Sequence, residues 1–174
     1  MISNSTVDYI ILGCLSIQPM SGYDIKRLIS ISTGLFYNAS YGSIYPTLKK
    51  FEEAGLVNSE EVVENGRFKK IYALTYEGQR EFMEWLEEPP RPIVIKNDML
   101  LRLFFYRHLP QDKVLSITAS HIEQLKAFKL ELEEIEAAEG AGADKFQRYT
   151  LRWGMDFYDF QIGWYKKILL ELDD

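Results

Sequence analysis

The chain has 174 residues, 47% of them hydrophobic, which is enough to bury the core of one or two small domains. No apolar run reaches the ~18 residues of a membrane span, and the N-terminal residues lack the pattern of a secretory signal. A single cysteine, Cys14, excludes an internal disulfide framework and a multi-cysteine zinc site, and two histidines argue against a histidine-rich metal centre. We therefore expect a cytoplasmic protein with no membrane association, no metal and no cofactor.

The net charge is −6, and neither half of the chain is basic. Residues 1–88 contain eight Lys or Arg against twelve Asp or Glu, and residues 89–174 contain twelve against fourteen. Because attraction to phosphate depends on local Lys and Arg density, DNA binding would have to come from a small patch.

Residues 1–88 predict three helices, a β-hairpin and a closing helix. Ser5 with Asp8 and Ser21 with Asp24 match the capping box that starts a helix. A third helix begins at residues 41–45, because Pro46 has no backbone N–H and fits best in a first turn. Two β-rich runs, 57–63 and 68–74, flank an Asn-Gly pair that favours a tight turn, and a helix resumes at residue 75. This order predicts a winged helix-turn-helix.

Pro89, Pro90 and Pro92 predict a linker over residues 89–97. Beyond it we expect a short helix over 98–108, a long heptad-patterned helix over 112–139, a turn at 140–143 and a final helix over 144–172. The predicted fold is mainly α with a small β-hairpin. It combines a winged helix-turn-helix DNA-binding domain (1–88) with a coiled-coil-like helical domain (98–174) for dimerisation and effector binding.

The final helix is apolar along two stripes, and both stripes need cover. One chain has too few helices here to supply it, so we predict a dimer. The residues assigned to dimerisation are Val114, His121, Leu125, Phe128, Trp153, Phe157, Phe160 and Trp164. Two alternatives stay open: the aromatic stripe could line a pocket for a flat ligand, and the histidine of this set could tune assembly with pH instead of packing as a hydrogen-bonded interface residue.

The strongest functional candidate is the segment 38–50, NASYGSIYPTLKK. Tyr41, Tyr45 and Lys49 lie four residues apart, on the helix face opposite the apolar residues. A helix N-terminus with small polar side chains suits the major groove, because its amides meet phosphate while the side chains reach base edges. These small polar residues are Asn38, Ser40 and Ser43. The alternative is a helix packed on another domain, with its tyrosines half-buried.

The hairpin carries the densest basic cluster, Arg67, Lys69 and Lys70. As a wing it would place cations over the DNA backbone or the minor groove. The alternative is an ordinary solvated turn. Its field is weakened by three glutamates of the same hairpin, Glu60, Glu61 and Glu64.

Several motifs together resemble the PadR family of bacterial transcriptional regulators. They are SGYDI (21–25), IYPTLKKF (44–51) with Gly-Leu (55–56), and YALTYEG (72–78). Trp85-Leu86, KNDMLL (96–101) and Trp164 are similar to the branch with a long C-terminal domain, which includes phenolic-acid-responsive repressors. The likeness spans nearly the whole chain.

The resemblance implies a homodimer that binds double-stranded DNA at a pseudo-palindromic operator. It implies repression in most members and, in some, release by a small effector. A small aromatic effector is a candidate partner, because the branch includes phenolic-acid-responsive repressors, but the resemblance does not transfer the effector's identity. Matching positions imply DNA contacts by Ser40, Tyr41, Ser43, Tyr45 and Lys49, with the three wing cations beside them. A second hypothesis is a winged-helix protein-interaction module that does not bind DNA. An enzyme has no supporting motif, since the sequence contains no phosphate loop, nucleophile elbow or dinucleotide turn.

Overall fold

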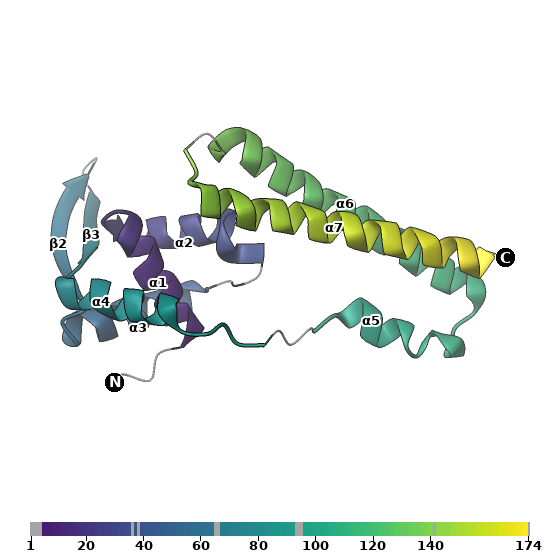
Figure 1. Ribbon diagram of the computed structural model, residues 1–174, viewed down its shortest axis with the longest axis horizontal. Coiled ribbons are helices and arrows are strands. Elements are labelled where there is room, and N and C mark those ends of the chain that lie inside the picture. Colours follow the sequence, from purple (N-terminus) through teal and green to yellow (C-terminus); the bar gives the residue numbers. More distant parts are fainter. Residues whose placement is uncertain are drawn as a thin grey trace. The chain divides into compact units, whose positions relative to one another are not determined.

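The computed structural model (Figure 1) describes residues 5–35, 37, 39–64, 67–92, 96–140 and 142–173. The chain divides into two compact units, Met1–Arg91 and Pro92–Asp174. Within the described ranges, no helix is both long and apolar enough to cross a membrane.

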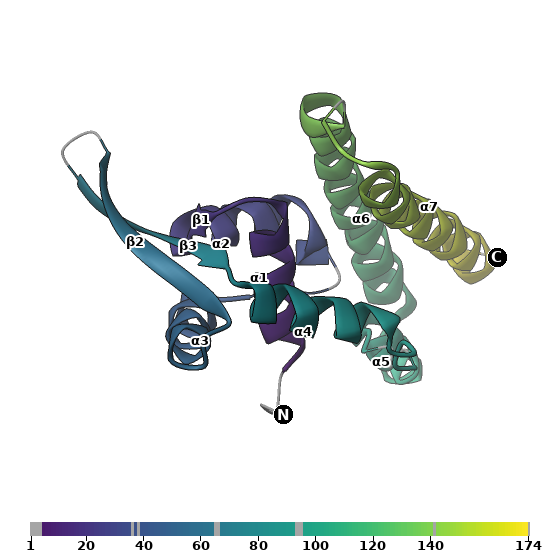
Figure 2. The ribbon, with the colours of Figure 1, turned by 60° about the vertical axis from the view of Figure 1, so that its left-hand side comes forward.

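The described residues of the N-terminal unit form four α-helices and a three-stranded antiparallel sheet. The helices are α1 (Thr6–Ile17), α2 (Gly22–Ile31), α3 (Tyr41–Glu53) and α4 (Tyr76–Glu87), with a 3-10 turn at Thr33–Leu35. The sheet has the order β1-β3-β2, formed by β1 (Met20–Ser21), β2 (Val57–Glu64) and β3 (Arg67–Leu74). Figure 2 shows the β2–β3 hairpin extending past the helices of this unit. Strand β1 is an addition to the predicted elements.

The predicted helix starts are present. Capping boxes join Ser5 to Asp8 at α1 and Ser21 to Asp24 at α2. Pro46 differs from expectation, because it is the sixth residue of α3 and so lies one turn deeper than predicted. A proline there removes the N–H that would bond the carbonyl four residues earlier, so it interrupts the ladder inside the helix.

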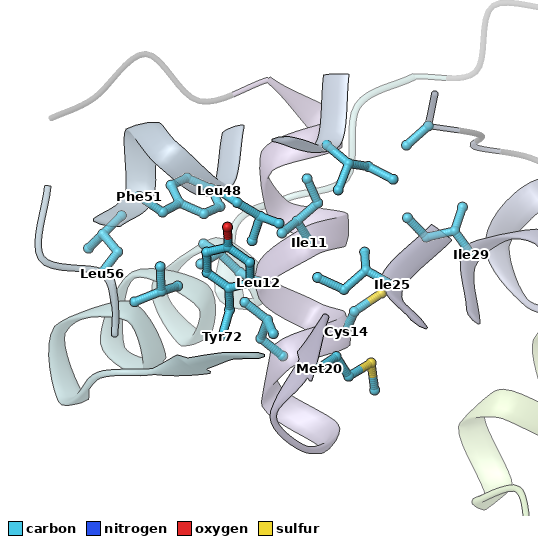
Figure 3. Close-up of a cluster of buried hydrophobic side chains, with 14 residues drawn as sticks. Ile11, Leu12, Cys14, Met20, Ile25, Ile29, Leu48, Phe51, Leu56 and Tyr72 are labelled. Carbon is cyan, nitrogen blue, oxygen red and sulfur yellow. The ribbon is translucent and has the colours of Figure 1, made fainter. Parts of the chain in front are cut away.

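The core of this unit lies where α1, α2 and α3 meet the sheet (Figure 3). Helix α1 contributes two fully buried residues, Ile11 and Leu12, and α2 contributes the isoleucines of its inner face. The α3 residues predicted to face inwards are also fully buried: Ile44, Leu48 and Phe51. The inner face of α3 is therefore committed to the core, which leaves the opposite face for other contacts.

Helix α4 closes the unit by packing on α1. The ring of Tyr9 stacks on that of Trp85, with centroids 4.6 Å apart and planes 6° apart. The ring of Phe82 lies so close to Gly13 that an added Cβ would meet it at 3.2 Å. The first and last helices of the unit are thus in direct contact.

A hydrogen-bonded clasp explains the sequence Leu-Thr-x-x-Gly at the start of α4. Thr75 N–H donates to the carbonyl of Leu56 (3.1 Å), and its hydroxyl donates to that of Gly55 (2.8 Å). The same hydroxyl accepts from Gly78 N–H (3.1 Å). Gly55 has φ +71°, a conformation that glycine adopts without strain. An added Cβ on Gly78 would stand 2.1 Å from the Leu56 carbonyl oxygen, so this position has no room for a side chain.

The C-terminal unit is built on two long helices, α6 (Gln111–Glu139) and α7 (Lys145–Asp173), which pack side by side (Figure 1). Before them lie α5 (Asp98–Leu103) and a 3-10 turn, Tyr106–His108. The sequence predicted one continuous helix over 98–108. The break turns Tyr106 inwards, where its hydroxyl lies 3.4 Å from the Met99 sulfur.

The two apolar stripes of α7 have different environments. Tyr158, Ile162 and Tyr165, from one stripe, are buried. The other stripe is largely exposed, including Phe146, Tyr149, Trp153, Phe157 and Phe160. The expectation that the unit leaves one face of this helix without an internal partner is therefore met in the described part of this unit.

Candidate nucleic-acid interface

The N-terminal end of α3 is fixed by its own hydroxyls. Ser40 N–H donates to Ser43 Oγ (3.1 Å), and Ser43 Oγ donates back to the Ser40 carbonyl (2.8 Å). Ser40 is exposed and Ser43 half-buried. A helix start that is capped and open to solvent presents partial positive charge and hydroxyl groups, which are groups that bind phosphate and base edges.

Tyr45 and Lys49 lie one turn apart on the face of α3 opposite the core. Tyr45 is 49% exposed, and the Lys49 side chain is 77% exposed, with Glu53 3.8 Å away along the helix. The Tyr45 ring also covers the start of α2, since an added Cβ on Gly22 would meet it at 2.8 Å. The motifs SGYDI and IYPTL therefore interlock through one glycine and one aromatic ring.

Three of the predicted DNA contacts lie outside what the structure describes. Asn38 is not among the described residues, and of Tyr41 and Arg67 only the backbone is described.

The wing lysines contact acidic side chains of the helices. Lys69 Nζ lies 3.1 Å from Asp24 Oδ2 in α2, and Lys70 Nζ lies 2.9 Å from Glu52 Oε2 in α3. Burial raises the pKa of Asp24, but hydrogen bonds from Ser21 and Lys69 outweigh it, so the pKa of this carboxyl is lowered overall. The sequence alone indicates only the glutamates of the same hairpin as acidic neighbours of these lysines, because nothing local in the chain relates residue 69 to residue 24.

Asp8, in α1, binds two residues of α3, Lys50 and Thr47. Its carboxylate is buried, accepts the Ser5 N–H (2.9 Å) and pairs with Lys50 Nζ (2.8 Å), and it also accepts from Thr47 Oγ1 (3.3 Å). Burial raises the pKa of Asp8, but the hydrogen bonds and charge of Lys50 and the Ser5 amide hold it below its ordinary value of 3.8. The sequence predicted only the capping contact. Through Lys50, Asp8 orients the helix whose outer face carries Tyr45 and Lys49.

The residues predicted for dimerisation differ in their exposure. Val114 and Leu125 are buried within the C-terminal unit itself. The exposed members of the set are Phe128, Trp153, Phe157 and Phe160. Of the remaining two, Trp164 is half-buried, and His121 meets Tyr165 edge to face at 4.9 Å. His121 Nε2 is buried and has no hydrogen-bond partner in the described part of the chain.

One cavity of the C-terminal unit lies between α5 and α6. Its lining includes Asn97, Arg102, Ser120 and His121. None of the lining residues belongs to the aromatic stripe of α7, so the stripe is an exposed surface and not the wall of this cavity.

Both parts of the chain match models of known protein families. A model of the PadR-like family of transcriptional regulators matches residues 11–84, and a model of the C-terminal region of virulence activator alpha matches residues 95–173. A crystal structure of a PadR-like transcriptional regulator from Bacillus cereus superimposes with a TM-score of 0.86 at 30% identity, covering 95% of this chain and 97% of that one. The chain belongs to the PadR-like family of transcriptional regulators. Its relatives are regulators and not enzymes.

Three further comparisons concern the PadR protein of Bacillus subtilis, a negative transcriptional regulator. The sequences are 30% identical over 121 residues, which is 68% of this chain and 66% of that protein. Its crystal structure in complex with operator DNA matches with a TM-score of 0.87 at 26% identity, covering 97% and 99% of the two chains. The same protein has been crystallised with p-coumaric acid. The predicted fold class, a winged helix-turn-helix followed by a helical region, is thereby confirmed.

Proposed function

We propose that this PadR-like protein is a homodimeric, sequence-specific DNA-binding regulator that acts in the cytoplasm. The observation that carries the proposal is the outer face of α3, where a capped, exposed helix start precedes Tyr45 and Lys49. This face is polar while the inner face is buried, which is what a helix needs to enter a major groove. The operator complex of the Bacillus subtilis relative supports the same use of the fold.

We assign one role to each predicted domain. Residues 1–88 bind DNA, 89–97 connect, and 98–174 dimerise. The exposed stripe of α7, with Trp153, Phe157 and Phe160, forms the contact with a second copy because it has no cover in the described part of the C-terminal unit. Val114 and Leu125 are already buried within one copy of the chain, so their part in dimerisation is indirect: they pack beneath the helices that form the contact. A two-fold axis then places two copies of α3 in successive major grooves, about 34 Å apart.

The regulatory direction is repression with release by a small aromatic effector. Support comes from the Bacillus subtilis relative, which is a negative regulator and binds p-coumaric acid. An effector can release the operator only by binding the DNA-free state more tightly than the DNA-bound state. An effector that binds equally well with and without operator would contradict this mechanism.

The experiment is fluorescence anisotropy with DNA from upstream of the protein's own gene, beside scrambled DNA, at two salt concentrations, with and without phenolic acids. Specific, salt-sensitive binding that one compound reverses is the expected result. Equal, weak binding to both DNAs at both salt concentrations would leave two explanations, a regulator whose operators lie elsewhere and an interaction module without DNA binding, and a search for protein partners would then come first.

A further inference from the structure

Lys70 joins the hairpin to α3. Its Nζ is 2.9 Å from Glu52 Oε2 and 5.3 Å from the centre of the Tyr72 ring. The other oxygen of Glu52 accepts a hydrogen bond from Ser59 Oγ on β2. One carboxylate in the last turn of α3 therefore binds both strands of the hairpin. The pKa of Glu52 is lowered, first by the hydrogen bond of Ser59 and then by that of Lys70.

Lys69 joins the hairpin to a different helix. Its Nζ is 3.1 Å from Asp24 Oδ2, the oxygen that also accepts from Ser21 Oγ (2.6 Å) and Ser21 N–H (3.3 Å). Asp24 is thus held in place by the capping box of α2. Because neighbouring side chains of a strand point to opposite faces, the two lysines contact two helices from the two faces of β3.

We infer that Lys69 and Lys70 are positioning residues, which fix the wing to α2 and α3, and that they do not serve as phosphate contacts. The inference deepens the proposed function and rests on it, because it concerns how the wing is presented to DNA. Each ammonium group has a carboxylate oxygen within 3.1 Å, so its charge is already compensated and a phosphate contact would bring a second anion close to that carboxylate. Binding by the wing then depends on its orientation and not on the charge of these two residues.

The two roles predict opposite effects for the removal of Glu52. If Lys70 contacts phosphate, Glu52→Met frees its ammonium group and removes a negative charge, so DNA binding tightens and becomes more salt-dependent. If Lys70 is a tether, the same variant loosens the wing and weakens binding. Lys70→Met adds a second criterion, because loss of a phosphate contact lowers the salt slope by about 0.9, whereas loss of a tether leaves the slope unchanged.

The experiment measures operator affinity at several salt concentrations for the wild type, Lys70→Met, Glu52→Met and their double variant. Glu53→Met is the matched control, since it removes a carboxylate from the same turn that pairs along the helix with Lys49 and, among the described residues, with no residue of the hairpin. We expect both single variants to bind about threefold to tenfold more weakly at an unchanged slope, the double variant to bind no more weakly than either, and the control to bind at least as well as the wild type.

Thermal unfolding without DNA completes the test. The assay temperature is kept below the unfolding transition of every variant, so that only folded protein is compared. Tighter binding by Glu52→Met, or a salt slope lowered by about 0.9 in Lys70→Met, would overturn the inference. Unchanged affinity in variants with a lowered melting temperature would overturn it too, because the contacts would then be merely structural. Failure of the proposed function is distinguishable, because the wild type itself would then not bind the operator.

Discussion

Gly78→Ala tests the clasp between α4 and the turn before β2. An added Cβ would stand 2.1 Å from the Leu56 carbonyl oxygen and 3.0 Å from Leu74 Cδ2. The first contact is with backbone, so no side-chain rotation relieves it, and α4 has to move away. That movement also strains the hydrogen bonds of Thr75 to Leu56 and Gly55.

The cost follows from these contacts. Overpacking costs about 1–3 kcal/mol, and each weakened hydrogen bond contributes about 1 kcal/mol, so we expect a loss of about 3 kcal/mol. For a unit of this size, that loss lowers the melting temperature by roughly 12–24 °C.

The assay is urea and thermal unfolding followed by circular dichroism. Gly42→Ala is the matched control in the same unit, because its Cβ would meet only Ser40 Oγ, at an ordinary 3.6 Å. Alanine there should leave the free energy of unfolding unchanged or raise it by about 0.5–1 kcal/mol. A Gly78→Ala protein as stable as the control would refute the steric argument.

Three further results are expected. Asp8→Asn should destabilise the protein at neutral pH by about 2–3 kcal/mol, because Lys50 loses a buried anionic partner. Since the pKa of Asp8 is lowered on folding, its contribution is present above pH 3.8 and disappears as the pH falls through the folded pKa, so urea titrations of the two proteins should converge in acid. Burial raises the pKa of Cys14 to about 12, so iodoacetamide at pH 8 should alkylate it only in denaturant; rapid labelling of the native protein would contradict its burial. Lys49→Ala should weaken operator binding and lower the salt slope by about 0.9, and an unchanged slope would remove Lys49 from the interface.

Features determined by local sequence were predictable. The capping boxes at Ser5 and Ser21 lie within four residues of the backbone they satisfy, and the hairpin follows from two β-rich runs that flank an Asn-Gly pair. The apolar face of α3 was also predictable, because helical periodicity alone separates Leu48 from Lys49.

Features determined by contacts between distant residues were not predictable. Asp8 and Lys50 are 42 positions apart, and Glu52 and Lys70 are 18 apart, so a charge count could not pair them. Strand β1 has only two residues, too few for a periodic pattern, and exists because Met20 pairs with Tyr72. Pro46 is a case in which the local rule was misleading. Proline prefers the first turn of a helix, but Pro46 lies inside α3, whose inner face is packed in the core.

The stacked rings of Tyr9 and Trp85 bring the two ends of the N-terminal unit together. Trp85 lies in the last turn of α4, directly before the prolines that stiffen the connection, and Tyr9 lies in the first turns of α1. Separation of α1 from α4 would therefore have to break this stack. Within the unit, the ion pairs of Lys69 with Asp24 and of Lys70 with Glu52 hold the hairpin to α2 and α3, so the wing and α3 belong to the same packed body as the stacked rings.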